Sequence, residues 1–109
     1  MLEMSGHAAL LKALADPTRR ALFERLCQGG EQCVGPLTIR AKISQPAVSK
    51  HLSILQSAGL VSGRIQGRQT FYRAHPLALA PLRDWTNQMA SFWENHIDQL
   101  EDLLNRMDQ

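Results

Sequence analysis

The sequence predicts a single, mainly α-helical domain that carries one β-hairpin. Three observations predict it. Apolar residues recur at helical spacing over most of the 109 residues. Prolines stand where helices are expected to begin, once after a capping aspartate and once after a tight break near the middle of the chain. Only residues 60–73 have strand-like composition, on both sides of a glycine turn.

Two short helices are expected before residue 30. The first covers residues 8–14, and Asp16-Pro17 separates it from the second, because proline disfavours a helical conformation in the residue before it. Asp16 can accept hydrogen bonds from the free N–H groups of the second helix, and Pro17 fits its first position. Gly29 and Gly30 are expected to end that helix.

Another pair of helices is expected between residues 35 and 58. Gly35-Pro36 begins the first, residues 43–46 form a tight break, and the second runs from Pro46 to Ala58-Gly59. Residues 48, 52 and 55 of this second helix are apolar at the spacing of one buried face. Its start and its other faces carry polar side chains, namely Ser44, Gln45, Ser49, Lys50 and Ser53.

A hairpin and a long helix complete the chain. Residues 60–66 and 69–73 are expected to form two strands joined at Gly67-Arg68, so the tip of the hairpin is basic. From Pro81 to about Asn105 a long helix carries an apolar stripe: Leu82, Trp85, Met89, Phe92, Trp93, His96, Leu100, Leu103 and Leu104. Such a stripe on a small protein favours packing against a partner helix, and an effector pocket at the same interface is compatible with it.

Charge is distributed unevenly along the chain. The net charge is only +2, yet residues 32–83 contain no Asp or Glu, whereas they contain seven Lys or Arg. From Asp84 onward six acidic residues face Arg106 alone. A basic middle followed by an acidic end indicates that one face of the protein binds a polyanion. The alternative is that these charges cluster by chance on a solvated face.

The order of elements is that of a winged helix-turn-helix, whose second helix can enter the major groove of double-stranded DNA. Gln45 can bond both edge groups of adenine, while Ser49 and Lys50 can reach a base or a phosphate. The hairpin residues would bind flanking phosphates or the minor groove. His51 either touches a phosphate or makes no contact. The predicted DNA-binding residues are Ser44, Gln45, Pro46, Ser49, Lys50, His51, Arg64, Arg68 and Gln69.

Four segments carry a family resemblance: residues 13–20 (ALADPTRR), 44–52 (SQPAVSKHL), 58–61 (AGLV) and 67–73 (GRQTFYR). In this order they resemble the ArsR-type family of winged-helix repressors. The resemblance implies a bacterial homodimer that binds an inverted-repeat operator and leaves it when an effector binds. It implies dimerisation helices at 1–15 and 77–106, a helix-turn-helix at 35–58 and a wing at 60–75. The expected interface residues are Leu10, Leu11, Trp85, Met89, Phe92, Trp93, His96, Leu100 and Leu103.

The metal sites of that family are largely missing. Its Cys-Val-Cys pattern is reduced here to Cys33-Val34-Gly35, and one thiolate cannot supply the three or four ligands that a soft metal ion needs. On the last helix Asp84 and His96 remain, but Thr86, Ile97 and Leu100 stand where further ligands are expected. The sequence therefore predicts a branch of the family without a metal or other cofactor.

Several alternatives stay open. Cys27 and Cys33 are either a redox switch or two small buried residues. His96 is either a ligand or pH sensor, or a hydrogen-bonded interface residue. An effector, as a small molecule or a redox change, is left unidentified. A winged-helix protein-interaction module without DNA binding is the second hypothesis, whereas no motif supports an enzyme. The chain has no signal peptide and no apolar run that could span a membrane, and two cysteines make no disulfide framework, so a cytoplasmic location is expected.

Overall fold

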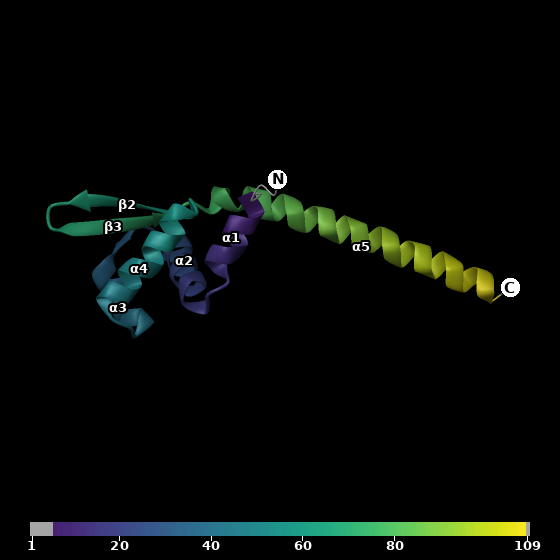
Figure 1. Ribbon diagram of the computed structural model, residues 1–109, viewed down its shortest axis with the longest axis horizontal. Helices are drawn as coiled ribbons and strands as arrows, with labels where there is room; N and C mark the ends of the chain where they lie inside the picture. Colours follow the sequence, from purple (N-terminus) through teal and green to yellow (C-terminus); the bar gives the residue numbers. More distant parts are fainter. Residues whose placement is uncertain (1–5, 109) are drawn as a thin grey trace.

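The computed structural model describes residues 6–108 and contains helices, a small sheet and a long final helix (Figure 1). Residues 1–5 of the expected first dimerisation segment lie outside this range, as does residue 109. The elements in order are α1 (Gly6–Leu14), α2 (Pro17–Gly29), β1 (Gln32–Cys33), α3 (Val34–Ala41), α4 (Gln45–Ser57), β2 (Val61–Gln66), β3 (Gln69–Ala74), a 3-10 turn (Pro76–Leu79) and α5 (Ala80–Met107).

Both expected helix starts are confirmed, with side-chain caps. The carboxylate of Asp16 accepts a hydrogen bond from the backbone N–H of Arg19 at 3.0 Å, and Pro17 is the first residue of α2. At α4 the hydroxyl of Ser44 accepts from the N–H of Ala47 at 3.3 Å. These oxygens replace the partners that the first N–H groups of a helix lack.

The sheet has three strands, so the expectation of a two-stranded hairpin was incomplete. The strands are antiparallel in the order β1-β3-β2, and β1 pairs Gln32 with Tyr72 and Cys33 with Phe71. A strand of two residues is too short to show a period in sequence, which is why it was missed. The predicted turn is confirmed: Gln66 pairs with Gln69, and Gly67 between them has a φ of 63°.

The core is formed where α1 to α4 meet the base of the hairpin. Val48, Leu52 and Leu55 of α4 are fully buried, as the helical spacing predicted. One interface expectation was wrong: Leu10 is only 3% exposed and belongs to this core, so it offers no surface to a second chain. Leu11, its neighbour on α1, is 42% exposed. α1 has only nine residues, so its apolar positions do not define from the sequence which of the two adjacent leucines faces the core.

The final helix projects away from the rest of the molecule (Figure 1). α5 has 28 residues, and only its beginning lies beside α1, which gives the chain principal extents of 74 × 33 × 20 Å. No side chain within α5, which is described from end to end, is buried in the single chain. None of the described helices is both long and apolar enough to cross a membrane.

Candidate nucleic-acid interface

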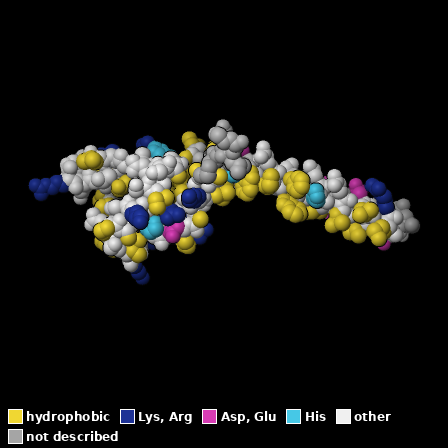
Figure 2. All heavy atoms as spheres, viewed as in Figure 1, with side chains coloured by type: hydrophobic (Ala, Val, Ile, Leu, Met, Phe, Trp, Pro, Cys, Tyr) yellow, Lys and Arg dark blue, Asp and Glu magenta, His cyan; other side chains and the backbone are white. Residues whose placement is uncertain are grey.

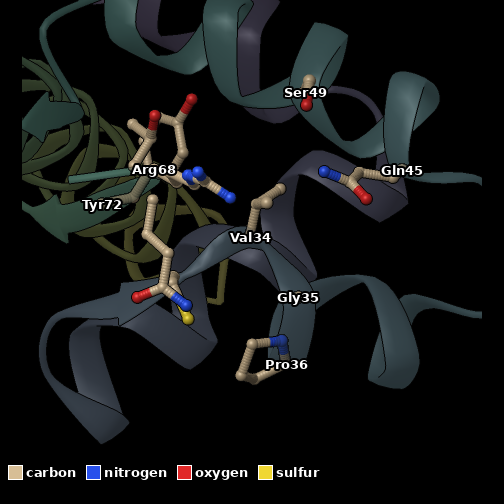
Figure 3. Close-up of a pocket in the computed structure, with 10 residues that line it drawn as sticks. Val34, Gly35, Pro36, Gln45, Ser49, Arg68 and Tyr72 are labelled. Atoms are coloured by element: carbon tan, nitrogen blue, oxygen red, sulfur yellow. The ribbon is translucent and has the colours of Figure 1, made fainter. Parts of the chain in front are cut away.

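A groove of about 400 Å³ opens where the beginnings of α3 and α4 face the tip of the hairpin. Gln45 and Ser49 of α4 line it on one side, and Arg68 of the turn and Gln69 at the start of β3 line it on the other. Figure 3 shows Gln45 and Arg68 on opposite sides of this space, with Val34 between them. The structure thus brings predicted DNA-binding residues from the start of α4 and from the tip of the hairpin together at one groove.

The exposure of these side chains suits contact with a polyanion. Gln45, Lys50 and Arg68 are exposed, and Ser49 is half-buried in the groove. Among the described residues Arg68 has no ion-pair partner, so its guanidinium is available to a phosphate. The opposite face of α4 is held by the core, so the polar start of the helix is fixed in orientation.

His51 lies back against α2 and not at the groove. Its Nδ1 is 4.0 Å from Oδ2 of Asp16, and its side chain is 23% exposed. The N–H of Arg19, which donates to Asp16, holds the pKa of that carboxyl below its usual value, and the nearby His51 and Arg19 side chains lower it further. His51 of α4 therefore lies close to the start of α2, where its Nδ1 has no hydrogen-bond partner among the described residues, and neither sequence hypothesis included this position.

Arg64 is held by the protein itself. Its Nε and Nη2 donate to the two carboxylate oxygens of Glu31 at 2.9 and 2.6 Å, and its Nη1 donates to Gln66 at 2.6 Å. The guanidinium carbon also lies 4.9 Å from the ring centre of Phe71. The Arg64 hydrogen bonds hold the pKa of Glu31 below its usual value, and Glu31 in turn raises the pKa of Arg64.

The contacts of Glu31 and Asp16 refine the sequence argument about charge. Residues 32–83 lack carboxylates, but Glu31 and Asp16 fold back against that segment from outside it. No pattern in the sequence indicates the contact between Glu31 and Arg64, because the two residues are 33 positions apart. Figure 2 shows most of the visible basic side chains on the body and hairpin, with a further basic group near the end of the final helix and apolar side chains along that helix.

The two cysteines are free thiols in different surroundings. Cys27 is exposed, so the alternative of two buried residues does not hold for it, whereas Cys33 is half-buried. Desolvation by neighbouring atoms, helped by the charge of Glu24, raises the pKa of Cys27. Within residues 6–108 no three His, Cys, Asp or Glu side chains gather in a way that could hold a metal ion. With Gly35 in place of a second thiolate, the residues here do not fit the metal site suggested by the resemblance.

The predicted stripe on α5 is largely solvent-exposed in the single chain. Phe92, Trp93 and Leu100 are 52%, 61% and 55% exposed. His96 lies within this stripe, and its ring centre is 4.5 Å from that of Phe92 and 6.1 Å from that of Trp93. At the beginning of the helix Trp85 stacks on His7 of α1 at 5.3 Å and is half-buried.

Comparison with known proteins identifies the family. Residues 16–62, from the cap of α2 to the second residue of β2, match the model of the bacterial regulatory protein arsR family. The chain is 42% identical over 86 residues to the HTH-type transcriptional regulator Rv2034 of Mycobacterium tuberculosis, covering 74% of this chain and 79% of that protein. The chain belongs to the ArsR family. This confirms the resemblance and the winged helix-turn-helix fold, and ArsR-family proteins are transcriptional regulators and not enzymes.

Other members of the ArsR family agree with this assignment. The arsenic resistance transcriptional regulator ArsR1 of Pseudomonas putida is 38% identical over 76 residues, which cover 70% of this chain and 59% of that protein. The ArsR-like transcriptional regulator from Rhodococcus sp. RHA1 superposes with a TM-score of 0.75 at 28% identity, over 90% of this chain and 92% of the other. The family match over residues 16–62 includes α4, and the hairpin tip at Arg68 lies beyond it.

Proposed function

We propose that this ArsR-family chain is a homodimeric repressor that binds an inverted-repeat operator in double-stranded DNA. The observation that carries the proposal is the groove shared by Gln45, Ser49 and Arg68. It combines groups that hydrogen-bond to base edges with a cation free for phosphate, the two components of sequence-specific recognition. In this arrangement the start of α4 enters the major groove, and the wing lies along the adjacent backbone.

The reading residues have different roles in this proposal. Gln45 contacts adenine, Ser49 contacts a base or a phosphate, and Lys50 contacts guanine or a phosphate. Arg68 and Gln69 at the hairpin tip hold the flanking backbone. Ser44 and Pro46 set the start of the helix and lie close to the DNA backbone, and His51 acts through its contact with Asp16.

The apolar stripe of α5 supports dimerisation. A helix with no buried side chain along its described length leaves its apolar surface in water, which a second copy of the same helix can cover. Leu11, Trp85, Met89, Phe92, Trp93, His96, Leu100 and Leu103 form the interface in this proposal. The two α4 helices then enter successive major grooves about one helical turn apart. A small-molecule or redox effector acting on this dimer, and a cytoplasmic location, belong to the same proposal.

A binding assay tests the proposal that the protein binds double-stranded DNA. Duplexes selected from a random pool are sequenced, and dissociation constants are measured for the selected operator and for an unrelated duplex. We expect a palindromic operator and an affinity that falls steeply with salt. Absence of retardation for every duplex at low salt would refute DNA binding and favour the protein-interaction module.

Two substitutions separate base reading from backbone binding. Gln45→Ala is expected to lower operator affinity while leaving the unrelated duplex nearly unaffected, because only a base contact is lost. Arg68→Gln is expected to weaken both complexes alike and to reduce the slope of log affinity against log salt by about 0.9 per lost phosphate contact. Equal loss of sequence preference in both variants would contradict these roles.

A further inference from the structure

We propose that Glu31 and Arg64 are positioning residues that fix the angle of the wing, so that Arg64 is not a DNA contact. The inference rests on the proposed DNA-binding function and reassigns one of the residues that the sequence placed on DNA. In this proposal the contact of Glu31 with Arg64 keeps Arg68, at the tip of the hairpin, in position at the groove.

Arg64 crosses the sheet to reach its partner. Arg64, Phe71 and Cys33 are in register across β2, β3 and β1, so the three positions form one row. The Arg64 side chain passes over the ring of Phe71 and ends on Glu31, which precedes β1 by one residue. A single side chain thereby joins the outermost strand to the segment that leaves α2.

The geometry of this pair is that of a strong positioning contact. Nε and Nη2 of Arg64 each donate to one oxygen of the same carboxylate, at 2.9 and 2.6 Å, so the pair is bidentate, and the remaining terminal nitrogen donates to Gln66. Bidentate pairs fix orientation as well as distance, in contrast to ordinary surface ion pairs. An arginine held by a carboxylate, an amide and an aromatic ring has few donors left for a phosphate.

Val61 at the base of the hairpin is packed in the core, whereas nearer the tip the attachment through the sheet is short, so an added contact at Arg64 can fix the angle of the hairpin. β1 contributes only two residues, Gln32 and Cys33, to the pairing with β3. The tip carries Arg68 four residues beyond Arg64, so a small change in angle at the base moves the tip away from Gln45. Glu31 also lies close enough to Arg73 on β3 for that cation to lower its pKa, which adds a second attraction at the base.

Four variants test the proposal: Glu31→Gln, Arg64→Gln, the charge exchange Glu31→Arg with Arg64→Glu, and Arg68→Gln as the matched phosphate-contact control. Affinities for the selected operator and an unrelated duplex are measured from 50 to 300 mM salt. The ratio of the two affinities is the readout, because the charge that Glu31→Gln removes affects both duplexes. Proton–nitrogen NMR spectra of each variant establish that it is folded.

We expect Glu31→Gln and Arg64→Gln to reduce the ratio by similar factors, about twofold to fivefold, as expected for loss of one partly exposed ion pair. Arg64→Gln leaves the salt slope unchanged, whereas Arg68→Gln lowers it by about 0.9 per contact. The charge exchange restores most of the ratio. An unchanged or higher ratio in Glu31→Gln, or a slope for Arg64→Gln as low as that of Arg68→Gln, would overturn the proposal, and the lower slope would show that Arg64 binds phosphate.

A measurement without DNA separates this inference from the proposed function. Amide hydrogen exchange of residues 63–66 in the free protein is expected to be faster in Glu31→Gln and Arg64→Gln than in the wild type, and restored by the charge exchange. Unchanged exchange in both single variants refutes the positioning role, even if DNA binding holds. Faster exchange in a protein that binds no duplex supports the wing contact and refutes only the DNA-binding proposal.

Discussion

Removing one apolar side chain from α5 tests the proposed dimer quantitatively. Leu100 is 55% exposed in the single chain, so burial in an interface would remove about half of its surface from water. Complete burial of a leucine is worth about 1.5–3 kcal/mol, so each copy contributes about 1 kcal/mol. A two-fold symmetric dimer contains two copies, and Leu100→Ala is expected to cost about 2 kcal/mol, or about a 30-fold increase in the dimer dissociation constant.

The assay is sedimentation equilibrium over a range of protein concentrations. Asn105→Ala is the matched control, because position 105 lies on the opposite side of the same helix from the stripe. It should leave the dissociation constant unchanged within about threefold, the effect expected of a surface substitution. A wild-type protein that stays monomeric at every concentration, or equal effects of the two substitutions, would refute the assignment of this face.

Three further predictions concern stability and reactivity. Leu52→Ala removes a fully buried side chain of the recognition helix and is expected to lower the free energy of unfolding by about 2–5 kcal/mol in urea denaturation, whereas a cost below about 1 kcal/mol would contradict its core position. The folded-state pKa of Asp16 lies below its ordinary value of 3.8, so the unfolded chain binds the proton more readily, and this contribution to stability is present above pH 3.8 and lost as the pH falls through the folded-state pKa. Asp16→Asn keeps the helix cap but cannot titrate, so thermal unfolding from pH 5 to pH 2 should depend less on pH in this variant, and an unchanged dependence would exclude Asp16 as its source. The raised pKa of Cys27 predicts slower alkylation by iodoacetamide at pH 7 than that of a free cysteine, and faster alkylation would argue for a reactive thiol.

Local chemistry explains why most helices could be predicted from the sequence. Asp16 with Pro17, and Ser44 with Pro46, determine where α2 and α4 begin, because capping and proline geometry act within one turn. The buried face of α4 followed from the same kind of short-range spacing. Gly67 likewise determined the hairpin turn through its positive φ.

Features that depend on distant residues could not be predicted in this way. β1 forms only because Gln32 and Cys33 meet β3, and two residues carry no period of their own. Arg64 was assigned to DNA from its charge and its place on the wing, and nothing nearby in sequence reveals that Glu31 holds it. Leu10 and Leu11 are adjacent leucines, and tertiary packing decides which one is buried.

The burial of α4 restricts how the protein can release DNA. Val48, Leu52 and Leu55 have no exposed surface, and close-packed side chains allow a helix neither to slide nor to tilt alone. In the dimer that we propose, an effector therefore has to change the angle between two rigid subunits. α5 is about 42 Å long at 1.5 Å per residue, so a rotation of about 10° about its far end would carry a recognition helix through about 7 Å. The distance between the two α4 helices would then change while each subunit stays rigid, and this distance would decide whether the dimer fits its operator.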